Sequence, residues 1–434
     1  MATTQTQTPL QSNSSALDDY GYPFPPDKKK RLRTLSIRTS KSALGACTSV
    51  LMTIVGFLLW LSRRGKHVPP LTPQTFHPRR ILVLRLDLIG DLVLSLTVVR
   101  ALKRAYPDAE IDLLAVPASG KIALHDPDLH EVIGYDPNIW RRPQALLRWN
   151  NWRELRTLLK RLRARHYDLA VSVFGPWAAT LAVLSGAPRR VGFGRESYFG
   201  FMTDSVPGRH WKPGDTKHEV DYCLQLAQKA GATVTSEDRI PRLYVEPEAQ
   251  QAVARLLGEV GVQEGEDRPL IACHVSSNNG QSKRWPLPYW ATLLDRLIRE
   301  QQARVVLTGA VADLPLIEQI TGRMREQPIN LAGKTSLPQL AALLQRANLM
   351  ISGDSGPMHI AAAVGTPLIA LHGPTDPAQS GPVSPKATIL RSPIWCSPCY
   401  RAKNTADCRF YTTQCMKNIT PAQVFEVVKE KLQA

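Results

Sequence analysis

An aspartate stands where a predicted helix begins, directly after a predicted buried strand. Asp91 ends the turn DLIGD at residues 87–91, which links the apolar run at 80–86 to a helical pattern from Leu92. A carboxylate there can cap the helix by accepting hydrogen bonds from free backbone N–H groups. It can also act as a general base that removes a proton from a hydroxyl group. The turn has only one glycine, which argues against a dinucleotide-binding dehydrogenase.

A hydroxyl-rich loop with a basic end follows a second predicted strand. Residues 274–286 read HVSSNNGQSKRWP and precede a predicted helix. Ser276 and Ser277 can donate hydrogen bonds to phosphate oxygens, while Lys283 or Arg284 supplies positive charge. This combination suits a departing diphosphate, and a solvated surface loop is the alternative interpretation.

A third segment, residues 351–377, combines a strand, a polar turn, a helix and another strand. Ser355 and the free N–H groups of the helix would face an anion, and Gly356 would let the backbone approach it. Asp354 would receive a hydroxyl or orient the lysine of the preceding loop, and His359 lies one turn into the helix. In the alternative interpretation, Asp354 is only a cap and His359 only packs.

Strand and helix patterns alternate along most of the chain, which predicts an α/β protein with parallel sheets. At 434 residues the chain exceeds what one core usually serves, so we expect two Rossmann-like doubly wound domains facing a cleft. The predicted strands cover residues 80–86, 110–116, 168–174, 270–275, 303–308, 349–352 and 368–372, and the predicted helices cover 92–106, 155–165, 289–300, 314–324, 337–346 and 357–364.

Composition changes along the chain predict the domain boundaries. Thr, Gln, Ser and Pro dominate residues 1–27, and a basic run follows them, so we expect disorder there. The predicted parts are a disordered basic tail at 1–41, a hydrophobic membrane segment at 42–62, a linker at 63–78, an N-terminal Rossmann-like domain at 79–238, an interdomain linker at 239–247 and a C-terminal Rossmann-like domain at 248–434.

The uncharged segment at 42–62 is long enough for a helix that crosses the hydrocarbon core of a membrane. Positive charges flank it on both sides, so the positive-inside rule does not assign its orientation. Arginines stand where a signal peptidase would need small residues, which favours a membrane anchor over a signal peptide. A helix that spans the membrane and one that lies in its surface are both compatible with this segment.

The chain carries a formal net charge of +17, which suits an anionic membrane surface or phosphorylated substrates. Nucleic acid is a rival partner on charge alone, but no recognised nucleic-acid module is present, so we expect none. Residues 140–165 form a basic, amphipathic, tryptophan-bearing segment. That segment is either an ordinary solvated helix face or a docking site for anionic lipid or a phosphorylated lipid-linked acceptor.

Two other motifs resemble metal sites only loosely. Cys396, Cys399, Cys408 and Cys415 have a zinc-like spacing, for which we favour reduced structural thiols. The acidic triplet at 126–128 mimics a metal-binding pair of carboxylates, but its surroundings favour a turn. We therefore expect no metal ion and no cofactor.

Three segments resemble the heptosyltransferases of bacterial glycosyltransferase family nine. They are RILVLRLDLIGDLVLSLTVVRALKRAYPDAEIDLL, SKRWPLPYW, and LAGKTSLPQL through ISGDSGPMHIAAAVGTPLIALHGPTDP. The resemblance extends from about Arg80 to the C-terminus. It implies a GT-B architecture, a nucleotide-diphosphate sugar donor held mainly by the C-terminal domain, and metal-independent inversion at the anomeric carbon.

The resemblance also implies roles for the residues described above. Asp91 would be the general base and Lys283 would neutralise the departing diphosphate. The donor-binding residues would be Ser276, Ser277, Asp354, Ser355, Gly356 and His359. Heptose, carried by ADP, is the sugar implied by the family alone.

We therefore expect a membrane-associated inverting glycosyltransferase that transfers a sugar, heptose from ADP-heptose by resemblance, to a lipid-linked or cell-surface polysaccharide acceptor. Because nucleotide sugars are cytosolic, the catalytic domain would face the cytoplasm at the cytoplasmic membrane. The alternative is a catalytically inert carbohydrate- or lipid-binding protein with the same fold. Acceptor-dependent release of nucleoside diphosphate distinguishes the two.

Overall fold

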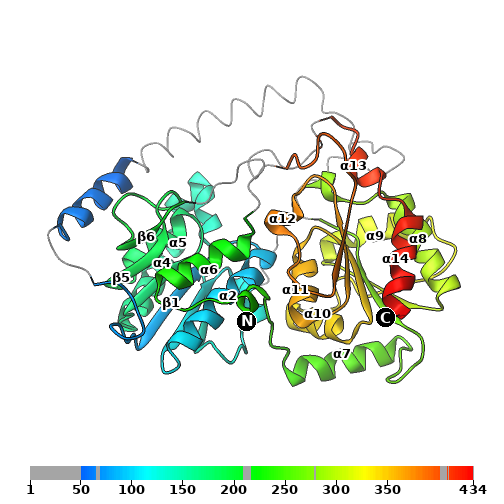
Figure 1. Ribbon diagram of the computed structural model, residues 1–434, viewed down its shortest axis with the longest axis horizontal. Coiled ribbons are helices and arrows are strands. Elements are labelled where there is room, and N and C mark those ends of the chain that lie inside the picture. Colours follow the sequence, from blue (N-terminus) through cyan, green and yellow to red (C-terminus); the bar gives the residue numbers. More distant parts are fainter. Residues whose placement is uncertain are drawn as a thin grey trace.

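A computed structural model describes residues 50–64, 69–208, 217–277, 280–400, 408 and 410–433. Two six-stranded sheets, each covered by helices, lie side by side (Figure 1). Every strand pair in the described residues is parallel. The predicted α/β architecture of two doubly wound domains is confirmed. The expected tail at 1–41 lies outside the described residues.

The N-terminal sheet is built from apolar segments whose side chains are buried on both faces, as parallel strands between helices require. Its strands are β1 (Arg80–Arg85), β2 (Glu110–Ala115), β3 (Glu131–Gly134), β4 (Leu169–Ser172), β5 (Arg189–Phe193) and β6 (Asp204–Val206). The helices of this half are α2 (Ile89–Ala105), α3 (Pro117–Gly120), α4 (Trp149–Ala164), α5 (Gly175–Leu184) and α6 (Glu219–Lys229).

The C-terminal sheet repeats the pattern. Its strands are β7 (Leu270–His274), β8 (Arg304–Thr308), β9 (Ile329–Asn330), β10 (Leu349–Gly353), β11 (Leu368–His372) and β12 (Ala387–Arg391). Its helices are α7 (Pro247–Glu259), α8 (Leu287–Glu300), α9 (Leu314–Thr321), α10 (Leu337–Arg346), α11 (Gly356–Val364), α12 (Pro377–Ser380), α13 (Gln414–Lys417) and α14 (Pro421–Gln433). Short 3₁₀ helices cover Lys121–Ala123, Pro137–Arg141, Pro143–Leu147, Ser236–Arg239, Gln281–Lys283 and Val311–Asp313.

The two sheets share one strand order. In the N-terminal sheet the order is β3-β2-β1-β4-β5-β6, and in the C-terminal sheet β9-β8-β7-β10-β11-β12. Each therefore changes direction of winding between its first and fourth strands, and ligands of such sheets bind at the carboxyl end of this switch point. Asp91 follows β1 at one switch point, and Asp354 follows β10 at the other.

Two helices that carry predicted site residues begin earlier than the sequence pattern indicated. Helix α2 begins at Ile89 rather than Leu92, so Asp91 lies inside its first turn and Leu88 is the N-cap. Helix α11 begins at Gly356, and its N-cap is Ser355 rather than Asp354. The boundaries differ because a glycine within a helical turn looks like a loop residue in sequence. Asp91 and Asp354 are therefore not simple helix caps.

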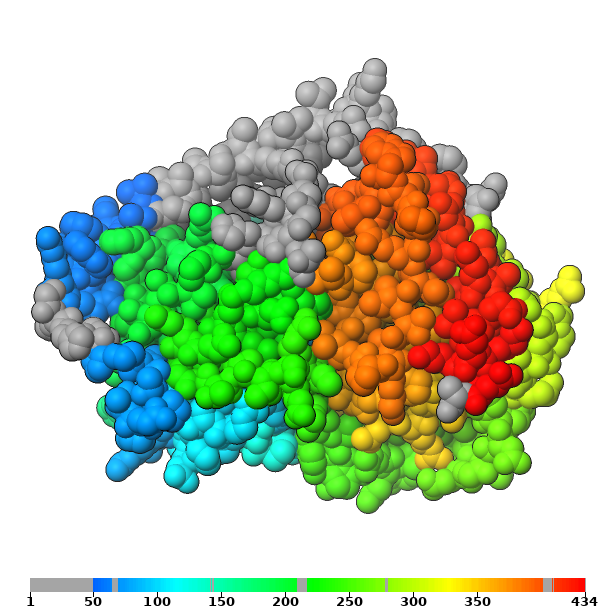
Figure 2. Space-filling model, viewed as in Figure 1, coloured from blue at the N-terminus to red at the C-terminus, as the bar shows by residue number. Residues whose placement is uncertain are grey.

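The two halves share an apolar interface. One cluster of buried side chains runs from α2 and α6 of the N-terminal half to α10 and α11 of the C-terminal half. Backbone contacts reinforce it: Leu243 N–H donates to the Ala363 carbonyl, and His218 Nε2 lies 3.0 Å from the Gly381 carbonyl oxygen. Figure 2 shows the green N-terminal half and the orange part of the C-terminal half in direct contact.

The predicted transmembrane helix is not supported. The described part of the chain contains no helix that combines the length and the apolar character needed to cross a membrane. Within the expected segment, residues 50–61 are helical, and residues 42–49 lie outside the described residues. This helix packs on α5 through Met52 and Leu59, and Arg63 donates hydrogen bonds to the backbone of Gly200 and Met202.

The acidic triplet is a turn, as its surroundings predicted. Asp128 N–H donates to the Asp126 carboxylate, and Arg100 pairs with both carboxylates. Among the described residues, Cys396, Cys399, Cys408 and Cys415 form no disulfide, and their assignment as reduced structural thiols stays a prediction.

Candidate functional site

A buried ion pair joins the two polar loops of the C-terminal sheet. Lys283 Nζ lies 2.7 Å from Asp354 Oδ2, and each side chain is 9% exposed. Lys283 Nζ also lies 4.2 Å from the centre of the Tyr400 ring, a cation–π contact. Burial acts to raise the pKa of Asp354, but Lys283 and His372 together hold it below its ordinary value. Asp354 therefore stays ionised and fixes the ammonium group at the switch point.

Two buried histidines beside this pair leave ring nitrogens without partners among the described residues. They are Nδ1 of His359 and Nε2 of His372. Burial lowers the pKa of His359 to about 4 against the opposing effect of Asp354, and burial also lowers the pKa of His372. Both rings are therefore neutral at physiological pH. An unpaired buried polar atom costs about 1–3 kcal/mol, and such atoms are common where a ligand supplies the missing partner.

The predicted donor-binding residues gather around the same point. Ser277 Oγ lies 3.5 Å from the Asp354 carbonyl oxygen, and Ser276 Oγ lies 3.2 Å from His274 Nε2. Ser355 Oγ lies 2.9 Å from Ser352 Oγ. Helix α11 begins at Gly356, and no side chain caps the backbone N–H groups of its first turn. In this conformation the three hydroxyl groups contact protein atoms, so binding of a phosphate by them requires exchange of these bonds.

Asp91 belongs to a charged cluster centred on one buried arginine. Arg85, the last residue of β1, is 2% exposed and contacts three carboxylates. Its guanidinium lies 2.7 Å from Asp87, 2.9 Å from Glu219 and 3.3 Å from Asp91. The Asp91 side chain is 36% exposed. The arginine thus orients the carboxylate and leaves part of it open to solvent or substrate.

The first turns of α2 and α11 pack against each other across the domain interface. A Cβ atom placed on Gly90 would lie 2.7 Å from Cδ2 of His359, and one on Gly356 would lie 3.5 Å from the Gly90 nitrogen. The absence of a side chain at Gly90 therefore permits the close approach, whereas a Cβ atom on Gly356 would make an ordinary contact. The contact places the first turn of α2, which contains Asp91, against His359 of α11, which interacts with Asp354 and Lys283.

In this arrangement a base from one domain lies apart from a positively charged site that can bind an anion. Asp91 supplies a carboxylate that can accept a proton, and the α11 N-terminus with Lys283 can stabilise negative charge. Positive helix ends from both domains point toward the same region. Proton removal on one side and departure of an anion on the other are the chemistry that this geometry can perform.

Sequence reasoning missed four residues of the site. Arg85 and Glu219 form the buried pair behind Asp91, while His372 and Tyr400 flank Lys283. Two of them carried a signal in the sequence. Arg85 is a charged residue in an apolar strand and must be paired, and His372 ends the strand next to β10. Glu219 and Tyr400 carried none, since both reach the site only through the folded chain.

Replacing Gly90 with alanine should destabilise the protein and lower its activity. The added methyl group would lie 2.7 Å from Cδ2 of the buried His359 ring, closer than a carbon–carbon contact allows. Overpacking of this kind costs about 1–3 kcal/mol. Chemical denaturation measures the loss. Gly258→Ala on α7 is the matched control, because its Cβ meets nothing within 4 Å; an equal effect of both substitutions would contradict the proposed close contact.

His359 should make stability depend on pH below neutrality. Its pKa falls from 6.5 in the unfolded chain to about 4 in the folded protein, so the unfolded chain binds more protons between these values. The free energy of unfolding should therefore decrease as the pH falls from 6.5 toward 4, by about 3 kcal/mol from this residue.

The check is urea denaturation across this pH range. His359→Asn should have a shallower pH dependence than the parent protein, and His166→Asn should retain the parent slope because His166 is exposed. Identical slopes for the parent and the His359 variant would show that the ring does not titrate as described.

Comparisons with known families and proteins agree with this fold and site. The sequence pattern of glycosyltransferase family 9 (heptosyltransferase) matches residues 155–409. The lipooligosaccharide heptosyltransferase 2 of Haemophilus influenzae is 31% identical over 72% of this chain and 88% of its own length. The lipopolysaccharide heptosyltransferase 2 of Escherichia coli is 29% identical over 80% of this chain and 97% of its own length.

Solved structures give the same result. The E. coli ADP-heptose lipopolysaccharide heptosyltransferase II superposes with a TM-score of 0.64 at 27% identity, covering 82% of this chain and 98% of that one. A family 9 glycosyltransferase from Veillonella parvula, at 24% identity and a TM-score of 0.69, shares the fold over 82% of this chain and 97% of its own. With its GT-B fold and its family pattern over more than half its length, the chain belongs to glycosyltransferase family 9, the heptosyltransferases.

Proposed function

We propose that this enzyme transfers heptose from ADP-heptose, with inversion, to a lipid-linked core oligosaccharide at the cytoplasmic face of the cytoplasmic membrane. One observation carries the proposal: the first turn of α2 with Asp91 packs against the first turn of α11 beside the Lys283–Asp354 pair. The names of the relatives supply the sugar and the acceptor class, since they are heptosyltransferases of lipopolysaccharide and lipooligosaccharide.

In the proposed step, Asp91 takes the proton of an acceptor hydroxyl as its oxygen attacks the anomeric carbon. The new carbon–oxygen bond forms while the bond from that carbon to the β-phosphate oxygen breaks. The electron pair of the broken bond leaves with ADP. Lys283 and the N–H groups at the start of α11 stabilise the developing charge, and Asp354 keeps the lysine in place.

The positions of the groups support inversion as part of the proposal. The base belongs to the N-terminal sheet and the diphosphate-stabilising groups belong to the C-terminal sheet. The acceptor would therefore attack from the side opposite the leaving group. The proposal also assigns His359 and His372 to the bound donor, because their unpartnered nitrogens border the Lys283–Asp354 pair.

Membrane association is supported by the N-terminal helix at residues 50–61. Eight of its apolar side chains are exposed: Val50, Leu51, Ile54, Val55, Phe57, Leu58, Trp60 and Leu61. A soluble surface rarely exposes so much contiguous apolar area, and an interfacial helix buries it among lipid headgroups and acyl chains. We propose that this helix lies in the membrane surface.

The test is purified full-length protein with ADP-heptose and core oligosaccharide lacking its terminal heptose. Acceptor-dependent release of ADP and a product heavier by one heptose are expected, and NMR of the new linkage should show inverted anomeric configuration. Retained configuration would overturn the mechanism. Donor binding without turnover against a panel of donors and acceptors would favour an inert binding protein instead.

A further inference from the structure

Helix α4 exposes an apolar stripe on the surface of the N-terminal half. Trp149 is 75% exposed and Trp152 is 44% exposed, and Leu147, just before the helix, is 88% exposed. Leu158 and Leu162 on the opposite side of α4 are buried against the sheet. The helix therefore already uses one apolar face for the core, while Leu147, Trp149 and Trp152 stay largely exposed.

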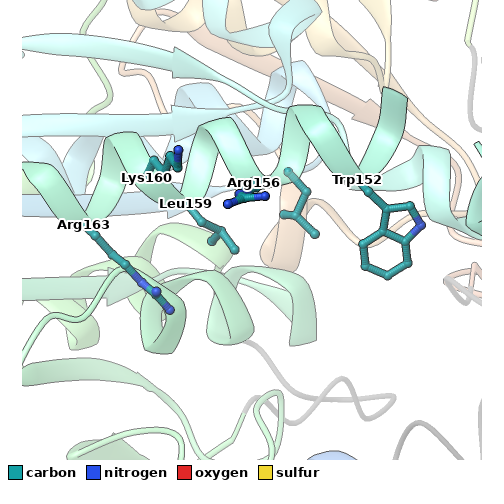
Figure 3. Close-up of a pocket in the computed structure, with 6 residues that line it drawn as sticks. Trp152, Arg156, Leu159, Lys160 and Arg163 are labelled. Atoms are coloured by element: carbon teal, nitrogen blue, oxygen red, sulfur yellow. The ribbon is translucent and has the colours of Figure 1, made fainter. Parts of the chain in front are cut away.

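Positive charge borders this stripe. A hollow of about 430 Å³ along α4 is lined by Trp152, Leu155, Arg156, Leu159, Lys160 and Arg163. Figure 3 shows Trp152, Leu159 and Arg163 extending from the same side of the helix. Within the described part of the chain, Arg153, Arg156 and Lys160 form no ion pair, whereas Arg161 pairs with Glu131. Three exposed cations thus remain available to an anionic partner.

Aromatic contacts link α4 with α5, and α5 begins beside Arg85. Trp152 lies 4.8 Å from Trp140, ring centre to ring centre, and Trp140 lies 6.5 Å from Trp177 on α5. The Arg85 guanidinium lies 5.2 Å from the ring centre of Phe174, which is the N-cap of α5. Helix α4 begins after β3, so its first turn lies at the carboxyl edge of the N-terminal sheet, the edge at which Asp91 follows β1, while α2 and α4 cover opposite faces of that sheet.

We propose that α4 docks on a bilayer surface rich in anionic lipids. The α4 surface consists of Leu147, Trp149, Trp152, Arg153, Arg156 and Lys160. Its tryptophans would sit at the level of the headgroups, and its cations would bind lipid phosphates. The inference rests on the proposed membrane site of action and adds to it a second contact, which turns the acceptor side of the cleft toward the membrane.

Charge complementarity and amphipathic side chains together favour a bilayer over other occupants. Nucleic acid would be bound by the cations but would not require two exposed tryptophans beside an exposed leucine. The N-terminal helix offers apolar contact with lipid, yet α5 lies between it and α4, with Ala179 and Val183 facing that helix and Ala178 and Leu181 facing α4. The two helices therefore flank one element, and substitutions in α4 separate its contribution to lipid binding from that of the N-terminal helix.

The experiment measures binding of full-length protein to vesicles without donor or acceptor. Phosphatidylcholine vesicles report the apolar contribution, and vesicles that also contain phosphatidylglycerol report the anionic contribution. The triple variant Arg153→Gln, Arg156→Gln, Lys160→Gln should bind the anionic vesicles about 100-fold more weakly, since each cation contributes roughly fivefold. Its binding to phosphatidylcholine alone should not change.

The matched control removes the same charges elsewhere. Lys229, Arg255 and Arg325 are exposed residues on other surfaces, and their combined substitution by glutamine should weaken anionic binding less than tenfold. Equal losses for both triple variants would overturn the proposal, because net charge rather than α4 would then govern binding. If the α4 triple variant lost binding to duplex DNA but bound vesicles as the parent protein does, the proposal would be overturned in favour of nucleic acid.

Fluorescence gives an independent readout. Trp149→Ser should reduce quenching by lipids brominated near the headgroup, while quenching at the N-terminal helix persists through Trp60. Unchanged quenching would place α4 away from the bilayer. Since no sugar transfer occurs in these assays, failure of the proposed transferase reaction would leave their outcome intact, and the two proposals fail separately.

Discussion

Asp91→Asn is expected to lower the turnover number for heptose transfer by about 10³-fold, the contribution of a well-placed general base. The amide keeps the size of the side chain and its place in the first turn of α2, but it cannot take a proton from the acceptor. Binding of ADP should change little, because the diphosphate-stabilising groups belong to the other sheet. Steady-state kinetics and ADP titration measure the two effects.

Asp87→Asn is the control for this result. Asp87 contacts the same arginine, Arg85, at 2.7 Å, but lies before α2 rather than inside it. If the Asp91 effect arose only from disturbing the arginine cluster, both variants would lose activity to the same extent. We expect the Asp87 variant to retain more than a tenth of the parent turnover. Full activity of the Asp91 variant would remove the base from the mechanism.

Lys283→Met should damage both catalysis and stability. Without the ammonium group the departing diphosphate loses its main cation, and we expect kcat/KM to fall by about 10³-fold. The Asp354 carboxylate is left buried without its partner, which destabilises a protein by about 3–5 kcal/mol. Because burial then raises the pKa of Asp354, protonation relieves the penalty, so the loss of stability should be smaller at low pH than at high pH.

The double variant Lys283→Met, Asp354→Asn separates the two losses. Replacing the unpaired carboxylate by an amide should restore most of the unfolding free energy, since no buried charge remains. Activity should stay low, because the cation is still missing. Recovery of activity together with stability would mean that Lys283 acts only by holding the fold and has no direct role at the diphosphate.

Local sequence patterns predicted much of the fold. Helix α10 and strand β11 begin and end where hydrophobic periodicity placed them, at 337–346 and 368–372. The bounds of these elements are predicted correctly because apolar spacing and flanking turn residues act within a few positions. Helix α4 shows the limit, since it begins at Trp149 rather than Leu155. Its first turn is polar and tryptophan-rich, and neither feature marks a helix start.

Local sequence patterns also identify the polar loops. Asp354, Gly356 and Asp91 are identified because each follows an apolar strand, the position where parallel sheets bind ligands, whereas the choice of Lys283 over Arg284 rests on the family resemblance. The pairing of Lys283 with Asp354 was predicted as one of two roles for the aspartate, and the structure selects it. The serines were expected to face a phosphate, whereas the structure places them against protein atoms.

The sequence by itself determined which residues stand at strand ends, and through them the fold class and the charged groups available for chemistry. Only the tertiary structure decided which of these groups meet. Arg85 and Glu219 are separated by 134 positions yet form one buried pair behind Asp91, and Gly90 contacts His359 across the domain interface. The reason is physical: secondary structure follows from neighbouring residues, whereas a site between two domains forms only when sheet order and close packing bring distant loops together.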